Sequence, residues 1–453
     1  MWDVVVAGAG AAGLVAALAA ADRGRRVLLL ERDAATPSTL ALSGGLIAAA
    51  GTRWQVEPDS PENFAADIRA KSGADIRAES GADIRAEPGA DIRAEPGDAL
   101  DPVLLRAVTQ GAAEALAFLD PMLPLHLHTG AKWPGHSAMR LHATPAESGA
   151  ELQALLRQAV ARQPRIAFRD GTPMTALRPA GVEAGGQVIE AGAVILATGG
   201  FGGAPDLVAR FCPEAAAAVH VGGTLSDGAG LRWAAALGAE LRCMAAYQGQ
   251  PHVSPHLIQG ARPRLGGALP ALGSVLVNRA GRRFVAEDMG PSELTAHLLA
   301  QPGGVAVEIW SRAAQEAALA GGPFRRAVEC GAVAECADLA TLAARFGLPL
   351  AALRETFFAL GSQPDAFGRT QWGHGLAPPF HAAEVTGALA HTQGGVRVDG
   401  AGRVLRPDGT PIPRLFAAGG VACGISGHGA AGYVPGNGLA QSFALGFRAG
   451  RAA

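Results

Sequence analysis

The chain has 453 residues, which at about 100 to 200 residues per domain predicts two or three domains. Its 38 basic and 40 acidic side chains give a net charge of −2, which argues against a nucleic-acid surface and favours a small-molecule partner. A hydrophobic content of 49% with 17% charged residues excludes global disorder and fits a large α/β protein. The five cysteines form no C-x-x-C pattern, so we expect reduced thiols. Neither a basic leader segment nor a long apolar run occurs, so we expect a cytoplasmic protein without membrane insertion.

The first thirty residues predict a dinucleotide-binding βαβ unit. The pattern favours a buried strand at Trp2–Ala7, a helix at Leu14–Arg23 and a second strand at Val27–Leu30. Between the first strand and the helix lies a G-x-G-x-x-G turn, Gly8–Gly13, and Glu31 follows its first glycine by 31 − 8 = 23 residues. The glycines allow a pyrophosphate to approach a helix N-terminus, and Glu31 can accept hydrogen bonds from a ribose. Because an acid disfavours a 2′-phosphate, we expect FAD or NAD rather than NADP.

An eight-residue repeat, A-D-I-R-A-x-x-G, occurs four times over residues 66–97. Eight residues advance a helix by about 80° beyond two full turns, so the isoleucines do not form one apolar stripe. Glycine ends each copy, and Pro88 and Pro96 interrupt the last two. We interpret the segment as a surface insertion expanded from one original copy, with no catalytic role. A docking segment for a partner is the alternative.

The rest of the chain predicts one domain inserted into another. Up to residue 245, and again from 375 to 453, helices alternate with apolar strands that end in glycine turns, whereas residues 246–374 are less regular. The expected helices are Asp101–Leu119, Ala150–Arg162, Ala313–Ala320, Leu339–Phe358 and Gly438–Arg448. The expected strands that end in glycine turns are Val194–Leu196 and the segment from Leu415. We therefore expect a cofactor-binding domain, 1–245 and 375–453, with a second domain, 246–374, inserted.

Eight motifs follow one another along nearly the whole chain. They are Gly8–Gly13, Ser43–Gly45, Ala197–Gly200, Ser226–Gly228, Asn278–Glu287, His391–Val396, Leu415–Gly420 and Gly436–Leu439. Together they resemble the fumarate reductase and succinate dehydrogenase flavoprotein superfamily, which also contains ketosteroid and tricarballylate dehydrogenases. The resemblance implies an α/β fold, with a Rossmann-type, glutathione-reductase-like FAD-binding domain and an inserted α+β capping domain. It also implies a substrate held between the cap and the isoalloxazine ring.

The same resemblance implies which residues contact FAD. They are Gly8, Gly10, Ala11, Ala12, Glu31, Arg32, Thr39, Ser43, Gly44, Gly45, Met174, Ala197, Thr198, Gly199, Asp227, Gly419, Gly420, Asn437 and Leu439. Ser43 and the two glycines after it are expected near flavin N5. Members with covalent flavin carry a histidine six residues before the first of these glycines, where this chain has Ser38, so we expect non-covalent FAD. The N-terminus of the last helix is expected to face flavin N1 and the C2 carbonyl.

The chain departs from the fumarate reductase pattern at three positions. The catalytic arginine expected four residues after Glu287 is Pro291, and the arginine that clamps a substrate carboxylate is replaced by Tyr433. The histidine of a Q-x-H-P segment is Gln250, and only His391, the substrate-binding histidine of the H-T-x-G-G segment, matches. A phenol is a neutral donor suited to a carbonyl, whereas a guanidinium suits a carboxylate. Fumarate and succinate are therefore poor substrate candidates.

Tyr433 resembles a tyrosine of the ketosteroid dehydrogenases, displaced by one residue, where a phenol and a glycine N–H hold the substrate ketone. Here the pair would be the Tyr433 hydroxyl and the Gly436 N–H, forming an oxyanion hole for the enolate left when the α-carbon loses its proton. The candidates for the base are Tyr247, His252, His256 and His391. We expect no metal site, because His126, His128, His136 and His142 lack metal-ligand spacing. Arg282 and Arg283 are expected to be solvated.

These features predict an FAD-dependent dehydrogenase, or desaturase, acting on the CH–CH bond α,β to the carbonyl of a cyclic or steroid-like ketone. Hydride would pass to flavin N5, and an external electron acceptor is expected because the chain has no haem or Fe–S cysteine motif. One alternative is a polycarboxylate dehydrogenase or ene-reductase of the tricarballylate or fumarate type. An alternative from another class is an electron-transfer flavoprotein that docks on a membrane or redox partner through the repeat.

Overall fold

The computed structural model describes residues 1–72, 100–129, 132–360 and 365–453, so the repeat from residue 73 onward lies outside the described residues. The chain divides into two compact units. The first contains Met1–Pro213, His220–Gln248 and Ala390–Ala453, and the second contains Glu214–Val219 and Gly249–Leu389. The second unit extends past the sequence-based boundary at 374 because β16 (Phe380–Thr392) is an interior strand of its sheet.

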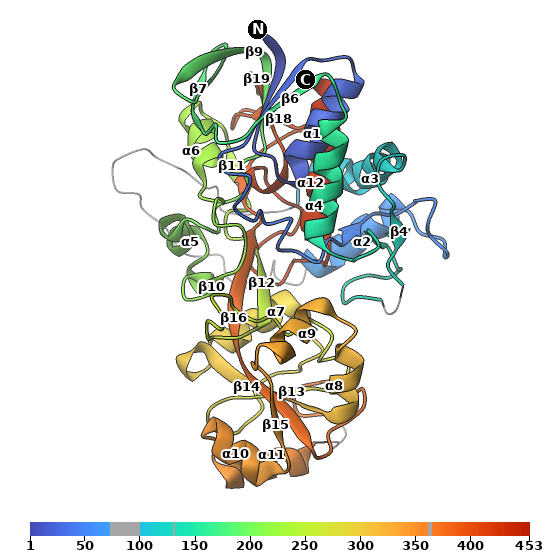
Figure 1. Cartoon of the computed structure of the whole chain (residues 1–453), viewed down its shortest axis with the longest axis vertical. Coiled ribbons are helices and arrows are strands. Elements are labelled where there is room, and N and C mark those ends of the chain that lie inside the picture. The colour runs from blue at the N-terminus through green and yellow to red at the C-terminus, as the bar shows by residue number, and fades with distance from the viewer. Residues whose placement is uncertain (73–99, 130–131, 361–364) are drawn as a thin grey trace. The chain divides into compact units, whose positions relative to one another are not determined.

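A largely parallel sheet forms the core of the first unit (Figure 1), in the order β18-β19-β9-β1-β2-β6. Its strands are β1 (Trp2–Ala7), β2 (Val27–Leu30), β6 (Ile166–Arg169), β9 (Gln187–Leu196), β18 (Arg403–Leu405) and β19 (Pro411–Ala417), with β7 (Met174–Arg178) and β8 (Gly181–Ala184) extending from β9. All neighbours from β19 to β6 are parallel, whereas β18 pairs antiparallel with β19 and β8 pairs antiparallel with β9. The last four residues of β1, Val4–Ala7, and all of β2 are apolar and buried, as expected where both faces of a parallel sheet are covered.

The carboxyl ends of four parallel strands are aligned at one edge of this sheet. Ala7 pairs with both Leu30 and Leu196, and Leu196 also pairs with Ala417. The glycine turn of the first motif, Glu31 and the two later strand-end motifs therefore emerge at the same edge. Ligands of open α/β sheets bind at such an edge. The predicted Rossmann-type organisation is confirmed.

Helix α12 (Asn437–Ala452) packs closely along α1 (Ala11–Asp22) through two glycines (Figure 1). A Cβ atom at Gly446 would lie 2.6 Å from the carbonyl oxygen of Ala12, and one at Gly450 would lie 2.3 Å from that of Ala16. These pairings make the helices parallel. At about 1.5 Å per residue, the N-terminus of α12 extends about 12 Å beyond that of α1.

The remaining elements of the first unit surround this sheet. They are β3 (Ile47–Ala48), α2 (Pro61–Ser72), α3 (Pro102–Leu119), β4 (His126–Leu127), β5 (Leu141–Ala143), α4 (Gly149–Ala161), α5 (Pro205–Phe211), α6 (Ala229–Ala236), β11 (Leu241–Arg242), β17 (Gly395–Val396) and the 3-10 turn η3 (Gly419–Val421). The chain crosses between the units at η1 (Pro213–Ala215), β10 (Val219–His220) and β12 (Tyr247–Val253). No helix in the described ranges combines the length and apolarity needed to cross a membrane.

The first copy of the repeat is built into the fold and is not part of a surface insertion. Residues 66–72 form the end of α2, where Ile68 is fully buried. Asp67 accepts hydrogen bonds from the Ser137 backbone N–H at 2.8 Å and from the buried guanidinium of Arg140 at 2.5 Å. Asp59 binds the same guanidinium at 2.8 and 3.0 Å. This copy therefore contributes to a buried ion-pair cluster.

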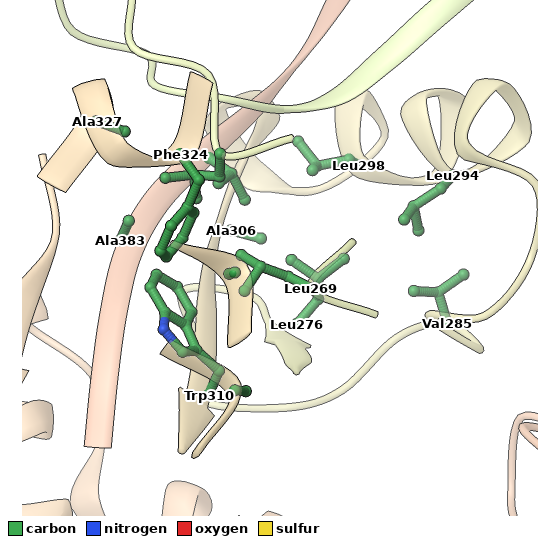
Figure 2. Packing of buried hydrophobic residues seen from close by; sticks show 14 residues of the cluster. Leu269, Leu276, Val285, Leu294, Leu298, Ala306, Trp310, Phe324, Ala327 and Ala383 are labelled. Atoms are coloured by element: carbon green, nitrogen blue, oxygen red, sulfur yellow. The ribbon is translucent and has the colours of Figure 1, made fainter. Parts of the chain in front are cut away.

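The second unit is a sheet with a buried cluster on each face. Its elements are β13 (Val275–Val277), α7 (Pro291–Leu299), η2 (Pro302–Gly304), β14 (Val305–Ser311), α8 (Arg312–Ala318), α9 (Gly322–Glu329), β15 (Ala334–Cys336), α10 (Leu339–Phe346), α11 (Leu350–Ala359) and β16. Alternate residues of β14 enter the two clusters: Trp310 meets Phe324 of α9 (Figure 2), and Ile309 belongs to the cluster that contains Leu353 of α11. Helices on an antiparallel sheet give the predicted α+β character.

Two local expectations for the second unit are wrong. The single helix predicted at Leu339–Phe358 is two helices, because Gly347 adopts a left-handed conformation with φ of 65° and ends α10. Arg283 is not solvated: its guanidinium donates to Glu287 at 2.6 Å and to Asp365 at 2.7 Å, and its side chain is 7% exposed. Arg369 also binds Glu287, at 3.0 Å. The glutamate of this motif is therefore held in a buried ion-pair network.

Adding a side chain at Gly446 tests the importance of the contact between α1 and α12. We expect Gly446→Val to lower the free energy of unfolding by about 1 to 3 kcal/mol, because the new methyl groups push α12 away from the Ala12 carbonyl. The measurement is denaturant unfolding, together with the flavin content of the purified protein. Arg451→Ala on the same helix, which removes an exposed ion pair with Asp22, is the control and should cost about 0.5 kcal/mol or less. Equal stability of the two variants would contradict the expectation.

Candidate active site

In the glycine turn after β1, Gly8 and Gly13 pack tightly against neighbouring backbone, whereas the space beside Gly10 is empty. A Cβ atom at Gly8 would lie 2.4 Å from the Ala197 carbonyl oxygen, and one at Gly13 would lie 1.8 Å from that of Gly8. No atom lies within 4 Å of the corresponding position at Gly10. Gly10 caps α1 without a side-chain hydrogen bond, so the first N–H groups of the helix are available to an anion. This turn fits a pyrophosphate, and Ala11 and Ala12 supply its helical N–H groups.

Glu31 is fixed at the end of β2 by backbone donors. Its carboxylate accepts from the Ala9 N–H and from the Arg32 N–H, each at 2.7 Å. The Arg32 guanidinium donates to Asp227 at 2.7 Å, which brings together two predicted FAD residues separated by 195 positions. A carboxylate accepts several hydrogen bonds, so Glu31 retains acceptor capacity for ribose hydroxyls.

The hydroxyl of Ser43 forms its hydrogen bonds within its own turn. Ser43 Oγ donates to the Leu40 carbonyl at 2.7 Å and accepts from the Gly45 N–H at 3.1 Å. Gly45 has φ of 71°, and a Cβ there would lie 2.8 Å from the backbone of Ser148. Gly44 is exposed and no atom lies within 4 Å of its Cβ position. A ligand at this turn would therefore contact the backbone of the turn and not the Ser43 hydroxyl.

Two predicted cofactor residues carry buried polar side-chain atoms that need a hydrogen-bond partner. Within the described part of the chain, neither polar atom of the Asn437 side chain has a hydrogen-bond partner, although the residue is 0% exposed. The hydroxyl of Thr198 is also buried and has no hydrogen-bond partner among the described residues. An unsatisfied buried amide costs about 1 to 3 kcal/mol, so a polar ligand is expected to contact these atoms. The residues present thus fit a dinucleotide cofactor.

The other predicted cofactor residues have identifiable places. The hydroxyl of Thr39 accepts from the Gly223 N–H at 3.0 Å. Gly199 and Gly419 have φ of 78° and 73°, which favours glycine at both turns. Met174, on β7, and Leu439, on the first turn of α12, are half-buried, and Gly420 follows Gly419 in η3. The FAD contacts of the individual residues stay predictions.

Tyr433 lies beside the N-terminus of α12. It is 7% exposed, and its ring meets that of His391 edge-on with centroids 5.8 Å apart. Burial raises the pKa of the Tyr433 phenol, and hydrogen bonding to the backbone of Gly436 and Gly438 acts in the opposite direction. The phenol is therefore neutral at physiological pH. The structure brings Tyr433, Gly436 and His391 together, and their catalytic roles stay predictions.

His391 packs onto the first turn of α12. A Cβ at Gly438 would lie 2.8 Å from Cε1 of the His391 ring, so glycine is needed there. Desolvation lowers the pKa of His391 to about 4, and the imidazole is neutral at pH 7. Nδ1 lies 3.3 Å from Nε2 of Gln393 and 3.4 Å from the carbonyl of Thr392. The contact with Gln393, whose amide nitrogen only donates, calls for a proton on Nε2, whereas the contact with the Thr392 carbonyl calls for a proton on Nδ1.

The other candidate bases have different environments. Tyr247 is fully buried at the start of β12. His252, in the second unit, has a side chain 1% exposed, with Nδ1 2.8 Å from the Glu308 carboxylate. Ser274 donates to the other Glu308 oxygen at 2.7 Å. His256 has a side chain 64% exposed and pairs with Glu384 at 2.7 Å.

Sequence reasoning missed a residue that supports the Tyr433 loop. His136 Nε2 lies 2.8 Å from the carbonyl oxygen of Pro435, and its Nδ1 lies 3.5 Å from the Arg140 guanidinium. The cation is a donor, so Nδ1 accepts and Nε2 donates to Pro435. The loop before α12 is thus tied to the buried Arg140 cluster. His136 and Pro435 are 299 positions apart, and no local pattern signals their contact.

Comparisons with known proteins agree with this geometry. A family model described as FAD binding domain matches residues 3–439. The fumarate reductase (cytochrome) of Shewanella frigidimarina is 27% identical, over 100% of this chain and 76% of that protein. The 4-oxocyclohexanecarboxylate 2-dehydrogenase of Sinomonas cyclohexanicum is 29% identical, over 99% of this chain and 92% of that protein. The solved 3-ketosteroid-Δ4-(5α)-dehydrogenase of Rhodococcus jostii RHA1, in complex with 4-androstene-3,17-dione, has a TM-score of 0.72 and 25% identity, covering 100% of this chain and 96% of that chain.

The chain therefore belongs to the FAD binding domain family, within the fumarate reductase and succinate dehydrogenase flavoprotein superfamily. The protein is an FAD-dependent oxidoreductase that acts on CH–CH type substrates. The predicted family, fold and cofactor are confirmed. Within the described residues, no cluster of three or more His, Cys, Asp or Glu side chains could hold a metal ion.

Removing the charge of Glu31 tests its role in cofactor binding. We expect Glu31→Gln to raise the Kd for FAD about tenfold, because a neutral amide loses the charge-assisted hydrogen bonds of the carboxylate. Titrating the FAD-free protein with FAD and following flavin fluorescence measures this. Glu190→Gln, at an exposed position of β9, is the control and should bind FAD like the parent protein. An unchanged Kd for Glu31→Gln would show that the Glu31 carboxylate does not bind the ribose of FAD.

Two buried histidines predict loss of stability in acid. Desolvation lowers the pKa of both His136 and His142 from 6.5 to about 4. Between these values the unfolded chain binds more protons than the folded chain, so the free energy of unfolding falls as the pH drops from 6.5 to 4. Each histidine contributes up to about 3 kcal/mol of this loss. Denaturant unfolding at pH 7, 5.5 and 4.5 measures it. His142→Gln should flatten the dependence, whereas the exposed control His297→Gln should leave it unchanged; equal slopes would contradict the assignment.

Proposed function

We propose that this flavoprotein desaturates the CH–CH bond α,β to the carbonyl of a cyclic ketone. The observation that carries the proposal is Tyr433: a buried, neutral phenol beside the N-terminus of α12, next to His391. By resemblance, fumarate reductases carry a carboxylate-clamping arginine at this position. A neutral donor favours an uncharged oxygen over an anion.

The roles of the residues follow from their environments. The Tyr433 hydroxyl and the Gly436 N–H bind the carbonyl oxygen and stabilise the enolate as the α-proton leaves. The N-terminus of α12 adds positive potential near this oxygen. FAD, when bound, supplies the hydride acceptor. The FAD is non-covalent in this proposal, because Ser38 stands where covalent members carry histidine.

The pKa of His391 narrows the choice of the residue that removes the α-proton. A pKa of about 4 makes His391 a weak base, so we assign it the positioning of substrate. His252 has an orienting carboxylate: Glu308 binds Nδ1, which leaves Nε2 to accept a proton and would stabilise the resulting imidazolium. Tyr247 stays the other candidate for proton abstraction.

The substrate class is supported by two relatives. One is named for 4-oxocyclohexanecarboxylate and another is solved with 4-androstene-3,17-dione, and both ligands are cyclic ketones. The first also carries a carboxylate, for which the neutral His391 can supply a hydrogen bond. An external electron acceptor and a cytoplasmic location are part of the same proposal.

A second candidate is a polycarboxylate dehydrogenase or ene-reductase. It is favoured by the fumarate reductase that aligns over the whole chain. The replacements Pro291, Tyr433 and Gln250 count against it, because they remove the charged groups that a dicarboxylate needs. Succinate as reductant, and fumarate with a reduced dye, separate this candidate from ketone desaturation.

Removing one hydroxyl tests the proposed oxyanion hole. We expect Tyr433→Phe to slow anaerobic bleaching of the bound flavin by 4-oxocyclohexanecarboxylate or a 3-ketosteroid by about 10²- to 10³-fold, because one donor to the enolate is lost. Stopped-flow absorbance of the flavin measures the rate. Ser442→Ala, which removes a hydroxyl from the same helix where it binds the Gly438 carbonyl, is the matched control. Unchanged bleaching by Tyr433→Phe, or faster bleaching by succinate than by any ketone, would refute the proposal.

A further inference from the structure

Two buried cysteines of the first unit bring their sulfur atoms together. The Sγ atoms of Cys243 and Cys423 lie 3.0 Å apart, although the residues are separated by 180 positions. They are 4% and 3% exposed, and neither forms a disulfide in this structure. A disulfide bond is about 2.05 Å long, so a movement of about 1 Å separates this contact from a covalent bond.

The fold creates this contact through a glycine-rich strand. Strand β11, which ends just before Cys243, pairs with β17, and Val396 of β17 accepts a hydrogen bond from the Cys423 N–H at 2.9 Å. A Cβ at Gly394 would lie 2.4 Å from the backbone of the residue after Cys243, and one at Gly395 would lie 2.4 Å from the backbone of the segment before Cys423. The two cysteine segments can therefore approach this part of the chain closely only because Gly394, just before β17, and Gly395, in β17, carry no side chains.

The backbone and the charges around the pair are also unusual. Cys243 has φ of 55°, a left-handed conformation that persists only where the surrounding structure fixes it. The adjacent Arg242 donates to Glu240 at 2.7 Å, and Glu240 also binds Arg397 at 2.8 Å. The pKa of Arg242 is raised first by its hydrogen bond to Glu240 and further by both thiols.

We propose that Cys243 and Cys423 are a redox-active dithiol that closes to a disulfide when a peroxide oxidises it. One thiolate attacks the O–O bond of the peroxide and becomes a sulfenic acid, releasing water once hydroxide is protonated. The second thiol then displaces water from the sulfenic sulfur and forms the S–S bond. Two thiols lose two electrons and two protons, and one hydrogen peroxide becomes two waters.

The cross-link acts on the candidate active site through Gln393. The Gln393 N–H donates to the Ala246 carbonyl at 2.7 Å, and its own carbonyl accepts from the Gly424 N–H at 2.7 Å. Gln393 is thus tied to both cysteine segments, and its side chain lies 3.3 Å from the His391 ring. Closing the disulfide restricts these segments and, through them, the position of His391.

The test is thiol counting with peptide mapping on the FAD-loaded protein. The reduced protein is exposed to equimolar hydrogen peroxide, alkylated under denaturing conditions and digested with trypsin without reductant. We expect three of the five thiols to stay available and the peptides Cys243–Arg264 and Leu415–Arg448 to appear joined. Dithiothreitol should restore all five. The oxidised protein should also show a higher midpoint of thermal unfolding, because the cross-link constrains the unfolded chain.

Matched variants decide between this pair and other thiols. Cys336→Ser, a buried cysteine of the second unit, should still form the cross-link, whereas Cys243→Ser should not. Five available thiols after oxidation, a cross-link that contains Cys212, or oxidation of a single sulfur to sulfinic acid would each overturn the proposal. Peptide mapping of the protein without substitutions shows which cysteines are joined even if a serine variant fails to fold.

Discussion

The close contact between α1 and α12 is the constraint on which the rest of the first unit depends. Gly446 and Gly450 let α12 rest on the backbone of α1, and this fixes two helix N-termini that point in the same direction. Each N-terminus carries a partial positive charge. One lies at the glycine turn that fits a pyrophosphate, and the other lies about 12 Å farther along the axis, beside Tyr433. A cofactor with a phosphate in its middle and a reducible ring at one end matches this spacing.

The two side chains beside the N-terminus of α12, Tyr433 and His391, are both uncharged. Burial keeps both Tyr433 and His391 in their neutral forms, so neither side chain beside α12 is charged at pH 7. The positive potential comes from backbone N–H groups, which stabilise charge that develops during a reaction better than charge already present on a hydrated substrate. This distinguishes the site from one built around guanidinium groups.

The sequence predicts the parts of this structure that depend on local pattern. Apolar strands and glycine turns located the cofactor edge, and Gly8 and Glu31 lie where the pattern indicates. Contacts across the chain leave no such pattern: His136 with Pro435 and Cys243 with Cys423 depend on how distant segments pack. Arg283 was misjudged because charged side chains are usually exposed, and only the fold supplies the carboxylates that bury it. The break at Gly347 was missed because a single glycine is a weak signal inside an apolar pattern.

The end of α2 has a consequence for the evolution of this chain. Asp67 and Ile68, which hold Arg140 and fill the core beneath it, belong to the first of four identical A-D-I-R-A segments. Every later segment carries the same aspartate and isoleucine in the same spacing. A change in copy number therefore leaves at least one anchor available as long as a single unit survives.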